Sequence, residues 1–143
     1  MVERKSIRSR LDAHNVNYEV SYTKSPFTFD VKRKSDGVSL FNMDSSIIFK
    51  DQYLELSTTL VTDSKIYGLG ESTRFEQAMQ PGNTFTLWAA DIPAASFYKN
   101  LYGSFPYYIN HLPDGTAHGA LLMNSNGMDI ALESGSLSFR TIG

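Results

Sequence analysis

Apolar side chains recur at every second position in short segments of this chain, and residues that favour turns separate the segments. The alternation is clear at residues 18–22, 27–34 and 137–141. Because the side chains of a β-strand point alternately to its two faces, this period predicts half-buried strands rather than helices. Closely spaced short strands with glycine-rich turns predict an all-β chain that folds as an antiparallel β-sandwich.

The turn residues predict how several of these strands connect. Ser35-Asp36-Gly37 predicts a hairpin between residues 27–34 and 38–41, and Asn126-Gly127 predicts a type I′ turn. Gly68 and Gly70 predict a bulge or a close backbone approach within a strand over 66–71. Further strands are expected at residues 47–49, 52–60, 84–89, 106–110, 117–123 and 128–132, and a short helical turn at 72–80.

Residues 84–130 gather aromatic side chains around one acidic residue. The rings belong to Trp88, Phe97, Tyr98, Tyr102, Phe105, Tyr107 and Tyr108, and Asp91 lies in an expected loop beside them. Rings around a carboxylate suggest a loop that faces a sugar. The alternative is a core loop whose rings fill space, and composition alone favours that alternative.

Short segments in a defined order carry a resemblance to a known family. They are Ser25-Pro26-Phe27, Arg33-Lys34-Ser35, Leu40-Phe41, Asp51-Gln52-Tyr53-Leu54, Ile66-Tyr67-Gly68-Leu69-Gly70-Glu71, Leu87-Trp88, Asp91, Asn100-Leu101-Tyr102-Gly103-Ser104, Pro106-Tyr107-Tyr108, Ala117-His118-Gly119 and Asn124-Ser125-Asn126-Gly127-Met128-Asp129. Together they resemble the amino-terminal β-domain of glycoside hydrolase family 31, the α-glucosidase and α-xylosidase family, in its plant-type form. One glycine motif alone would be weak, but several in family order are specific.

The resemblance implies a galactose-mutarotase-like sandwich that lacks some parts of the family's enzymes. Residues 1–143 are expected to form one β-sandwich domain, with the first strands of the family domain missing or shortened and residues 1–12 frayed. Residues 9–13 and 18–20 resemble an early strand pair of that domain. The (β/α)8 barrel that carries both catalytic carboxylates in the family is not expected in this chain.

Composition narrows the remaining possibilities. The chain has no cysteine, so neither a disulfide framework nor a thiolate metal site is expected. Residues 1–34 are net basic, but the charges alternate with apolar residues, which is typical of a solvated sheet face rather than of a nucleic-acid-binding surface. The start lacks an apolar run of signal-peptide length, and no segment is long enough to span a membrane. We therefore expect a cytoplasmic protein as written, or a secreted or vacuolar one if the chain is a fragment of a longer family member.

Few residues are candidates for chemistry. The resemblance implies that Asp91 binds sugar hydroxyls, with Trp88 beside it, because an ionised carboxylate accepts several hydrogen bonds. Glu71 is a candidate general acid or base, but without a second carboxylate nearby it is interpreted as a turn residue. The histidines His14, His111 and His118 are too scattered for a zinc site, and His118 is interpreted as a packed sheet residue. No cofactor, metal or catalytic residue is expected. Phe105, where the family commonly has histidine, and Val61, where it commonly has proline, depart from the family pattern.

Two functions from different classes remain. The first is a truncated, non-catalytic domain that acts by protein association or self-association through the region from Trp88 to Tyr108, with only weak α-glucoside binding. The second is a fragment of an active α-glucosidase whose barrel lies on the missing part and whose sugar site includes Asp91.

Overall fold

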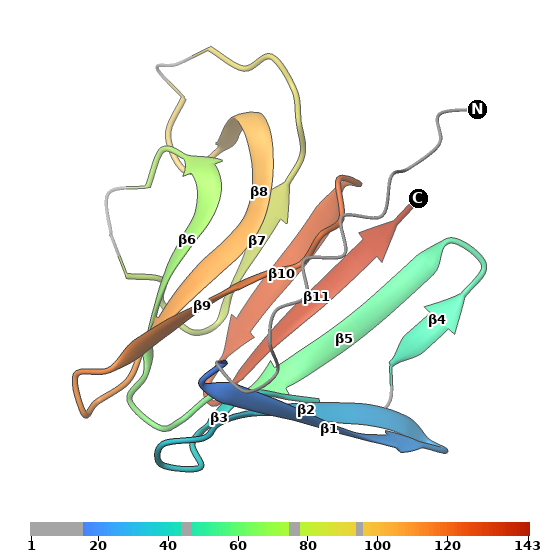
Figure 1. Ribbon diagram of the computed structural model, residues 1–143. Helices are drawn as coiled ribbons and strands as arrows, with labels where there is room; N and C mark the ends of the chain where they lie inside the picture. Colours follow the sequence, from blue (N-terminus) through green and yellow to red (C-terminus); the bar gives the residue numbers. More distant parts are fainter. Residues whose placement is uncertain (1–15, 44–46, 75–77, 94–95) are drawn as a thin grey trace.

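The computed structural model describes residues 16–43, 47–74, 78–93 and 96–143, and these residues form strands and turns but no helix (Figure 1). The strands are β1 (Tyr18–Lys24), β2 (Phe27–Arg33), β3 (Ser39–Asn42), β4 (Ile48–Lys50), β5 (Tyr53–Thr59), β6 (Lys65–Ser72), β7 (Asn83–Leu87), β8 (Asn100–His111), β9 (Ala117–Leu121), β10 (Met128–Glu133) and β11 (Ser136–Ile142). The predicted fraying of residues 1–12, the early strand at 9–13 and His14 lie outside the described residues.

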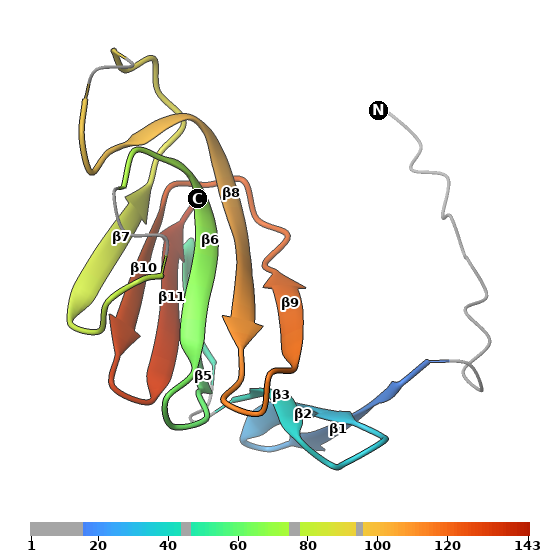
Figure 2. The ribbon, with the colours of Figure 1, turned by 90° about the vertical axis from the view of Figure 1, so that its left-hand side faces the viewer.

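The strands form three antiparallel sheets. A five-stranded sheet has the order β4-β5-β11-β10-β7, and two three-stranded sheets have the orders β1-β2-β3 and β6-β8-β9. The five-stranded sheet and the β6–β8–β9 sheet make two facing layers, and the β1–β2–β3 sheet crosses one end of them (Figure 2). The backbone N–H of Asn42 donates to Thr58 Oγ1 at 3.0 Å, which joins the small sheet to β5. The predicted all-β antiparallel sandwich is confirmed.

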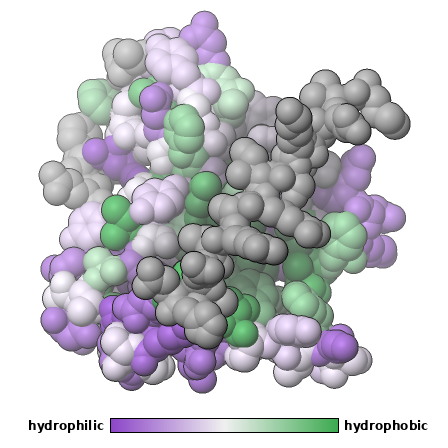
Figure 3. Space-filling model, viewed as in Figure 1, coloured by the Kyte–Doolittle hydropathy of each residue, from purple (hydrophilic) through white to green (hydrophobic). Residues whose placement is uncertain are grey.

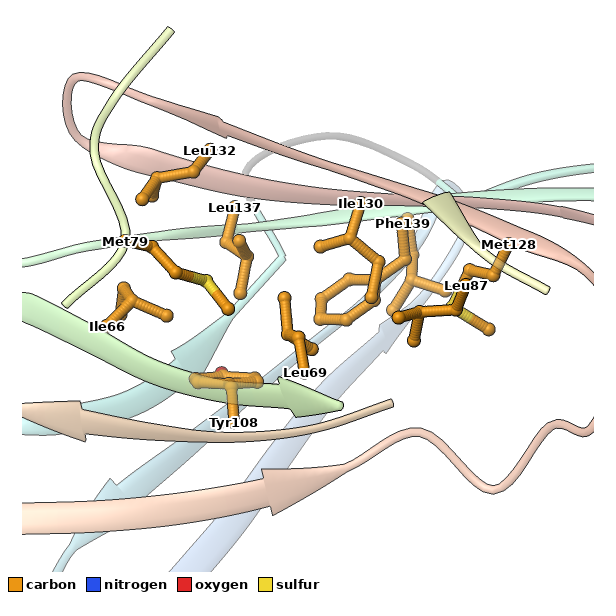
Figure 4. Packing of buried hydrophobic residues seen from close by; sticks show 11 residues of the cluster. Ile66, Leu69, Met79, Leu87, Tyr108, Met128, Ile130, Leu132, Leu137 and Phe139 are labelled. Carbon is orange, nitrogen blue, oxygen red and sulfur yellow. The ribbon is translucent and has the colours of Figure 1, made fainter. Parts of the chain in front are cut away.

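The core lies between the two facing layers. Figure 4 shows Ile130 and Phe139 of the five-stranded sheet pointing toward Leu69 of β6 and Tyr108 of β8. The rings of Tyr108 and Phe139 are 6.0 Å apart between centroids, at an angle of 37°. Both rings are almost completely buried. Burying each large apolar side chain stabilises the fold by about 1.5–3 kcal/mol, so the core between the two layers holds the layers together.

The predicted hairpin at residues 35–37 is confirmed. β2 pairs with β3, and the N–H of Gly37 donates to the carbonyl of Arg33 at 2.8 Å. Gly37 has a φ of 72°, a conformation that glycine adopts without a Cβ penalty. Asp36 accepts a hydrogen bond from the N–H of Val38 and forms an ion pair with Arg33 at 2.8 Å. The turn is therefore specified by residues close together in sequence.

The predicted irregularity at Gly68 and Gly70 is also confirmed. The pairing of β6 with β8 shifts register between Gly68 and Gly70 and again between Gly70 and Ser72. A Cβ on Gly68 would lie 2.6 Å from the carbonyl oxygen of Tyr107, and Gly68 has a φ of 97°. Only glycine fits here, since a side chain would meet backbone that cannot easily move.

The predicted type I′ turn at Asn126-Gly127 is wrong. Neither residue has the positive φ that this turn requires. β9 and β10, which would flank the turn, do not pair: β9 pairs with β8, whereas β10 pairs with β7 and β11. The segment instead carries the chain from one layer of the sandwich to the other.

Several element boundaries differ from those predicted from the sequence. Residues 72–74 and 78–80 are not helical, and residues 75–77 of the predicted helical turn lie outside the described residues. The strand predicted at 84–89 ends at Leu87, so Trp88 begins a loop. The strand predicted at 106–110 is longer, because β8 begins at Asn100.

Candidate functional site

The candidate site is the loop between β7 and β8, of which the structure describes residues 88–93 and 96–99, and we call these residues the Asp91 loop. In Figure 1 it projects beyond the ends of the strands that it connects. Asp91 is exposed, and its carboxylate has no hydrogen-bond or ion-pair partner among the described residues. An ionised carboxylate with free acceptor sites is suited to binding hydroxyl groups. The carboxylate of Asp91 is therefore accessible to a sugar, and the predicted sugar contact stays a prediction.

Trp88 marks the start of the loop. Its side chain is 63% exposed. Part of its ring packs over Gly127, where an added Cβ would lie 2.4 Å from Trp88 Cε3. The Cε3–Cζ3 edge of the indole therefore lies against Gly127, just before β10, while most of the ring is exposed. Sugars stack on exposed rings of this kind through their apolar C–H faces, which is the physical basis for pairing Trp88 with Asp91.

Asn100, at the start of β8, holds the base of the loop. Its side-chain amide donates to the carbonyl of Trp88 at 3.0 Å and to the carbonyl of Gly103 at 2.9 Å. On the other side, the N–H of Tyr98 donates to the carbonyl of Thr73 at 2.9 Å, and the N–H of Thr73 donates to Lys99 at 3.1 Å. Both ends of the Asp91 loop are therefore tied to the sandwich. Sequence reasoning missed Asn100 and Thr73, because a hydrogen bond to a distant carbonyl leaves no pattern in the sequence.

Replacing Asn100 with aspartate is expected to loosen the base of this loop. The aspartate has nearly the same shape but presents a carboxylate to the carbonyls that the amide now donates to. We expect a loss of about 1–3 kcal/mol in the free energy of unfolding, the usual cost of leaving such groups unpaired. The emission of Trp88, the only tryptophan, should shift as its ring leaves Gly127.

A matched control is Asn83→Asp, which removes an amide that donates to the carbonyl of Gln80 at 3.1 Å. Its effect on Trp88 emission should be small. Equal emission shifts in the two variants would show that Asn100 has no special hold on the loop.

The seven clustered rings divide between the surface and the core. Tyr108 is 1% exposed and belongs to the core, whereas the other six rings are exposed: Trp88, Phe97, Tyr98, Tyr102, Phe105 and Tyr107. The core-loop interpretation is therefore right only for Tyr108. The exposed rings, which we call the aromatic surface, lie on the Asp91 loop and on β8.

A cleft of about 460 Å³ lies near the return end of the loop. Arg74, Phe85 and Asn100 are among its lining residues, and the guanidinium of Arg74 lies 4.7 Å from the centroid of the Phe85 ring. Asp91 and Trp88 are not among the lining residues. The cleft and the two predicted sugar-binding residues therefore do not form one pocket.

The other candidate residues lie on strands β6, β8 and β9. Glu71 is exposed near the end of β6, next to Ser72, whose strand partner is Asn100 at the base of the loop. His111 ends β8, and His118 points inward from β9. In the described ranges, no three histidine, aspartate or glutamate residues come close enough to hold a metal ion. No helix long and apolar enough to cross a membrane occurs among the described residues.

The fold defines a class of protein, the antiparallel β-sandwich domains. The chain belongs to the N-terminal galactose mutarotase-like domains of glycosyl hydrolase family 31, which it matches over residues 3–130. The family predicted from the sequence motifs is confirmed.

Similar proteins include enzymes from fungi and plants. The chain is 43% identical over 142 residues to the α-glucosidase of Mucor javanicus, and the match covers 99% of this chain and 16% of that enzyme. It is 45% identical over 127 residues to α-xylosidase 1 of Arabidopsis thaliana, covering 86% of this chain and 14% of that enzyme. The chain thus spans a small part of the curated relatives that it matches.

A solved structure supports the fold. The GH31 dextranase of Flavobacterium johnsoniae complexed with glucose superposes with a TM-score of 0.69 at 18% identity. The superposition covers 87% of this chain and 15% of the dextranase. At this identity the likeness bears on the fold alone.

Proposed function

We propose that this domain is non-catalytic and acts by binding a protein surface through the aromatic surface around the Asp91 loop. The observation that carries the proposal is the exposure of six rings within residues 88–107. Contiguous exposed apolar surface in soluble proteins commonly marks a site of association. Aromatic residues are also enriched at the energetically important positions of interfaces.

The hydrogen bonds at the two ends of the loop support the same proposal. Because Asn100 and Thr73 hold Trp88 and Tyr98 to the sandwich, part of the ordering cost at these two rings is met before a partner arrives. A preorganised surface binds more tightly than a mobile one of the same area. Where no partner protein is present, the same surface is available for self-association.

The isolated chain is expected to associate or to bind a dye that reports exposed apolar surface. The reason is that solvent contact with the aromatic surface is unfavourable. Sedimentation velocity at micromolar concentration measures the association, and the variant Phe105→Ser should weaken it. A matched control is Phe49→Ser on β4, which removes an exposed ring outside the aromatic surface. A clean monomer without dye binding would contradict the proposal, and so would equal effects of the two substitutions.

A second candidate function is favoured by the free carboxylate of Asp91. In this reading the chain is part of an α-glucosidase or α-xylosidase whose catalytic barrel lies beyond residue 143, and Asp91 with Trp88 contributes to its sugar site. The names of the similar enzymes support this candidate. The two candidates are compatible, because the barrel would then be the protein that the aromatic surface contacts.

Sugar binding by the isolated chain is expected to be very weak. The carboxylate of Asp91 supplies a few hydrogen bonds, each contributing about 0.5–1.5 kcal/mol, and the ring of Trp88 supplies a stacking contact. Together these contacts barely offset the cost of association. Titration with maltose followed by NMR should therefore give a dissociation constant of about 1 mM or weaker. Micromolar binding that is lost in Asp91→Ala and kept in Glu71→Ala would instead make the chain a sugar-binding module in its own right.

A further inference from the structure

An apolar pocket opens where the three sheets meet. Its volume is about 340 Å³, which is within the range of small-molecule sites. Phe29, Val31 and Phe41 line it from the β1–β2–β3 sheet, and Leu56 and Phe139 from the five-stranded sheet. His118 and Ala120 line it from β9, one of the two edge strands of the β6–β8–β9 sheet. On the face that Figure 3 views, apolar side chains reach the surface among polar ones. We call this cavity the β9 pocket.

Two polar side chains in its wall lack hydrogen-bond partners. Neither buried ring nitrogen of His118 has a partner at normal hydrogen-bond length and angle, although the backbone of Leu40 lies near enough to raise the pKa of the imidazole. The hydroxyl of Tyr108, a second lining residue, is also buried without a partner. Buried polar groups are normally satisfied, because an unpaired one costs about 1–3 kcal/mol. The proposed association through the aromatic surface uses neither group. A molecule that enters the pocket can supply these partners. Without such a molecule, the unpaired groups lower the free energy of unfolding.

The protonation state of His118 decides what such a molecule must offer. Burial lowers the pKa of His118, and only part of this effect is offset by the nearby backbone of Leu40. The positive charge of Arg33 lowers the pKa further. His118 is therefore a neutral imidazole at neutral pH, with one nitrogen that donates and one that accepts. A hydroxyl group can satisfy either nitrogen, whereas a charged group would lose its hydration in an apolar cavity.

The geometry points to the β9 pocket as a binding site for a small, uncharged, largely apolar molecule that carries one hydroxyl group. The apolar walls take the body of the ligand, and the hydroxyl group pairs with the imidazole of His118. This site is separate from the Asp91 loop, since the pocket shares no lining residue with residues 88–99. It is independent of the proposed protein association and of any sugar binding.

Two matched ligands test the site on the unchanged chain. Benzyl alcohol carries the hydroxyl group, and toluene has nearly the same apolar body without it. We expect both to shift the methyl NMR signals of Ala120 and Leu122 in a saturable manner, with benzyl alcohol binding about 2- to 12-fold more tightly than toluene after correction for their solubilities in water. Absence of saturable binding for both ligands, or equal corrected affinities, would overturn the proposal.

Two variants then separate the hydrogen bond from the cavity. His118→Leu should abolish the advantage of benzyl alcohol while toluene still binds. Ala120→Phe should fill the pocket and abolish the binding of both ligands. A preference for benzyl alcohol that survives in a folded His118→Leu chain would contradict the role given to the imidazole. The comparison of the two ligands on the unchanged chain decides the matter even if a variant does not fold.

Discussion

Purified chain is expected to hydrolyse neither p-nitrophenyl α-glucoside nor p-nitrophenyl α-xyloside at a measurable rate. Glycoside hydrolysis ordinarily requires two carboxyl groups on opposite sides of the scissile bond, at separations of about 5–9.5 Å. Asp91 stands on the loop after β7 and Glu71 near the end of β6, and neither lines the cleft or the β9 pocket. Without such a pair the reaction forgoes an acceleration that in enzymes is typically at least about 10⁶-fold.

The assay is release of the nitrophenolate chromophore, followed over hours at several enzyme concentrations. Asp91→Ala is the informative variant, because a trace contaminant would be unaffected by it. Turnover that persists through further purification and disappears in Asp91→Ala would contradict the expectation and make Asp91 part of a catalytic site within this chain.

Phe139→Ala is expected to lower the free energy of unfolding by about 3–5 kcal/mol, the usual cost of truncating a buried phenylalanine. Phe139 is 1% exposed, and its ring packs on Tyr108 from the opposite layer. Removing the ring leaves a cavity at the contact between the two layers of the sandwich. Because single domains are stable by only about 5–15 kcal/mol, this loss would remove a large share of the free energy of unfolding.

Urea denaturation, followed by circular dichroism at low protein concentration, measures this change. Phe49→Ala is the matched control, since Phe49 is 73% exposed and its loss should change stability little. A loss below about 1 kcal/mol for Phe139→Ala would place that ring outside the folding core, since core phenylalanines cost several times more.

Local sequence was sufficient for most strands and for the turn between β2 and β3. Alternation predicts a strand because it follows from the geometry of one extended segment, without reference to any partner. The hairpin at residues 35–37 was predictable for the same reason, since Asp36 and Gly37 act on atoms within a few residues of them. The glycines of β6 announced an irregular strand, although not which carbonyl they would approach.

The same kind of signal failed at Asn126-Gly127. A two-residue turn forms only if the strands on either side of it pair with each other. β9 pairs with β8, the strand before it, and β10 pairs with β11, the strand after it, and with β7, so the segment connects two layers instead. Strand pairing between distant segments depends on the energy of the whole assembly, which local propensity does not contain.

The sequence predicted which residues the candidate site contains, but not the hydrogen bonds that hold its loop. The motifs and their resemblance pointed to the family and to an acidic loop rich in aromatic residues. The hydrogen bond from Asn100 to Trp88 forms only because the end of β7 and the start of β8 come together in space. The β9 pocket likewise requires three sheets to meet, and nothing at His118 in the sequence indicates that its imidazole would be buried without a partner.

Tyr107 and Tyr108 show where the limit falls. The sequence by itself determined that these neighbouring rings point to opposite faces of one strand, because side chains alternate in every extended segment. Only the tertiary structure decided that Tyr108 is buried and Tyr107 exposed. The five-stranded sheet covers one face of the β6–β8–β9 sheet and leaves the other to solvent, and which face is covered depends on contacts between strands that are distant in the chain.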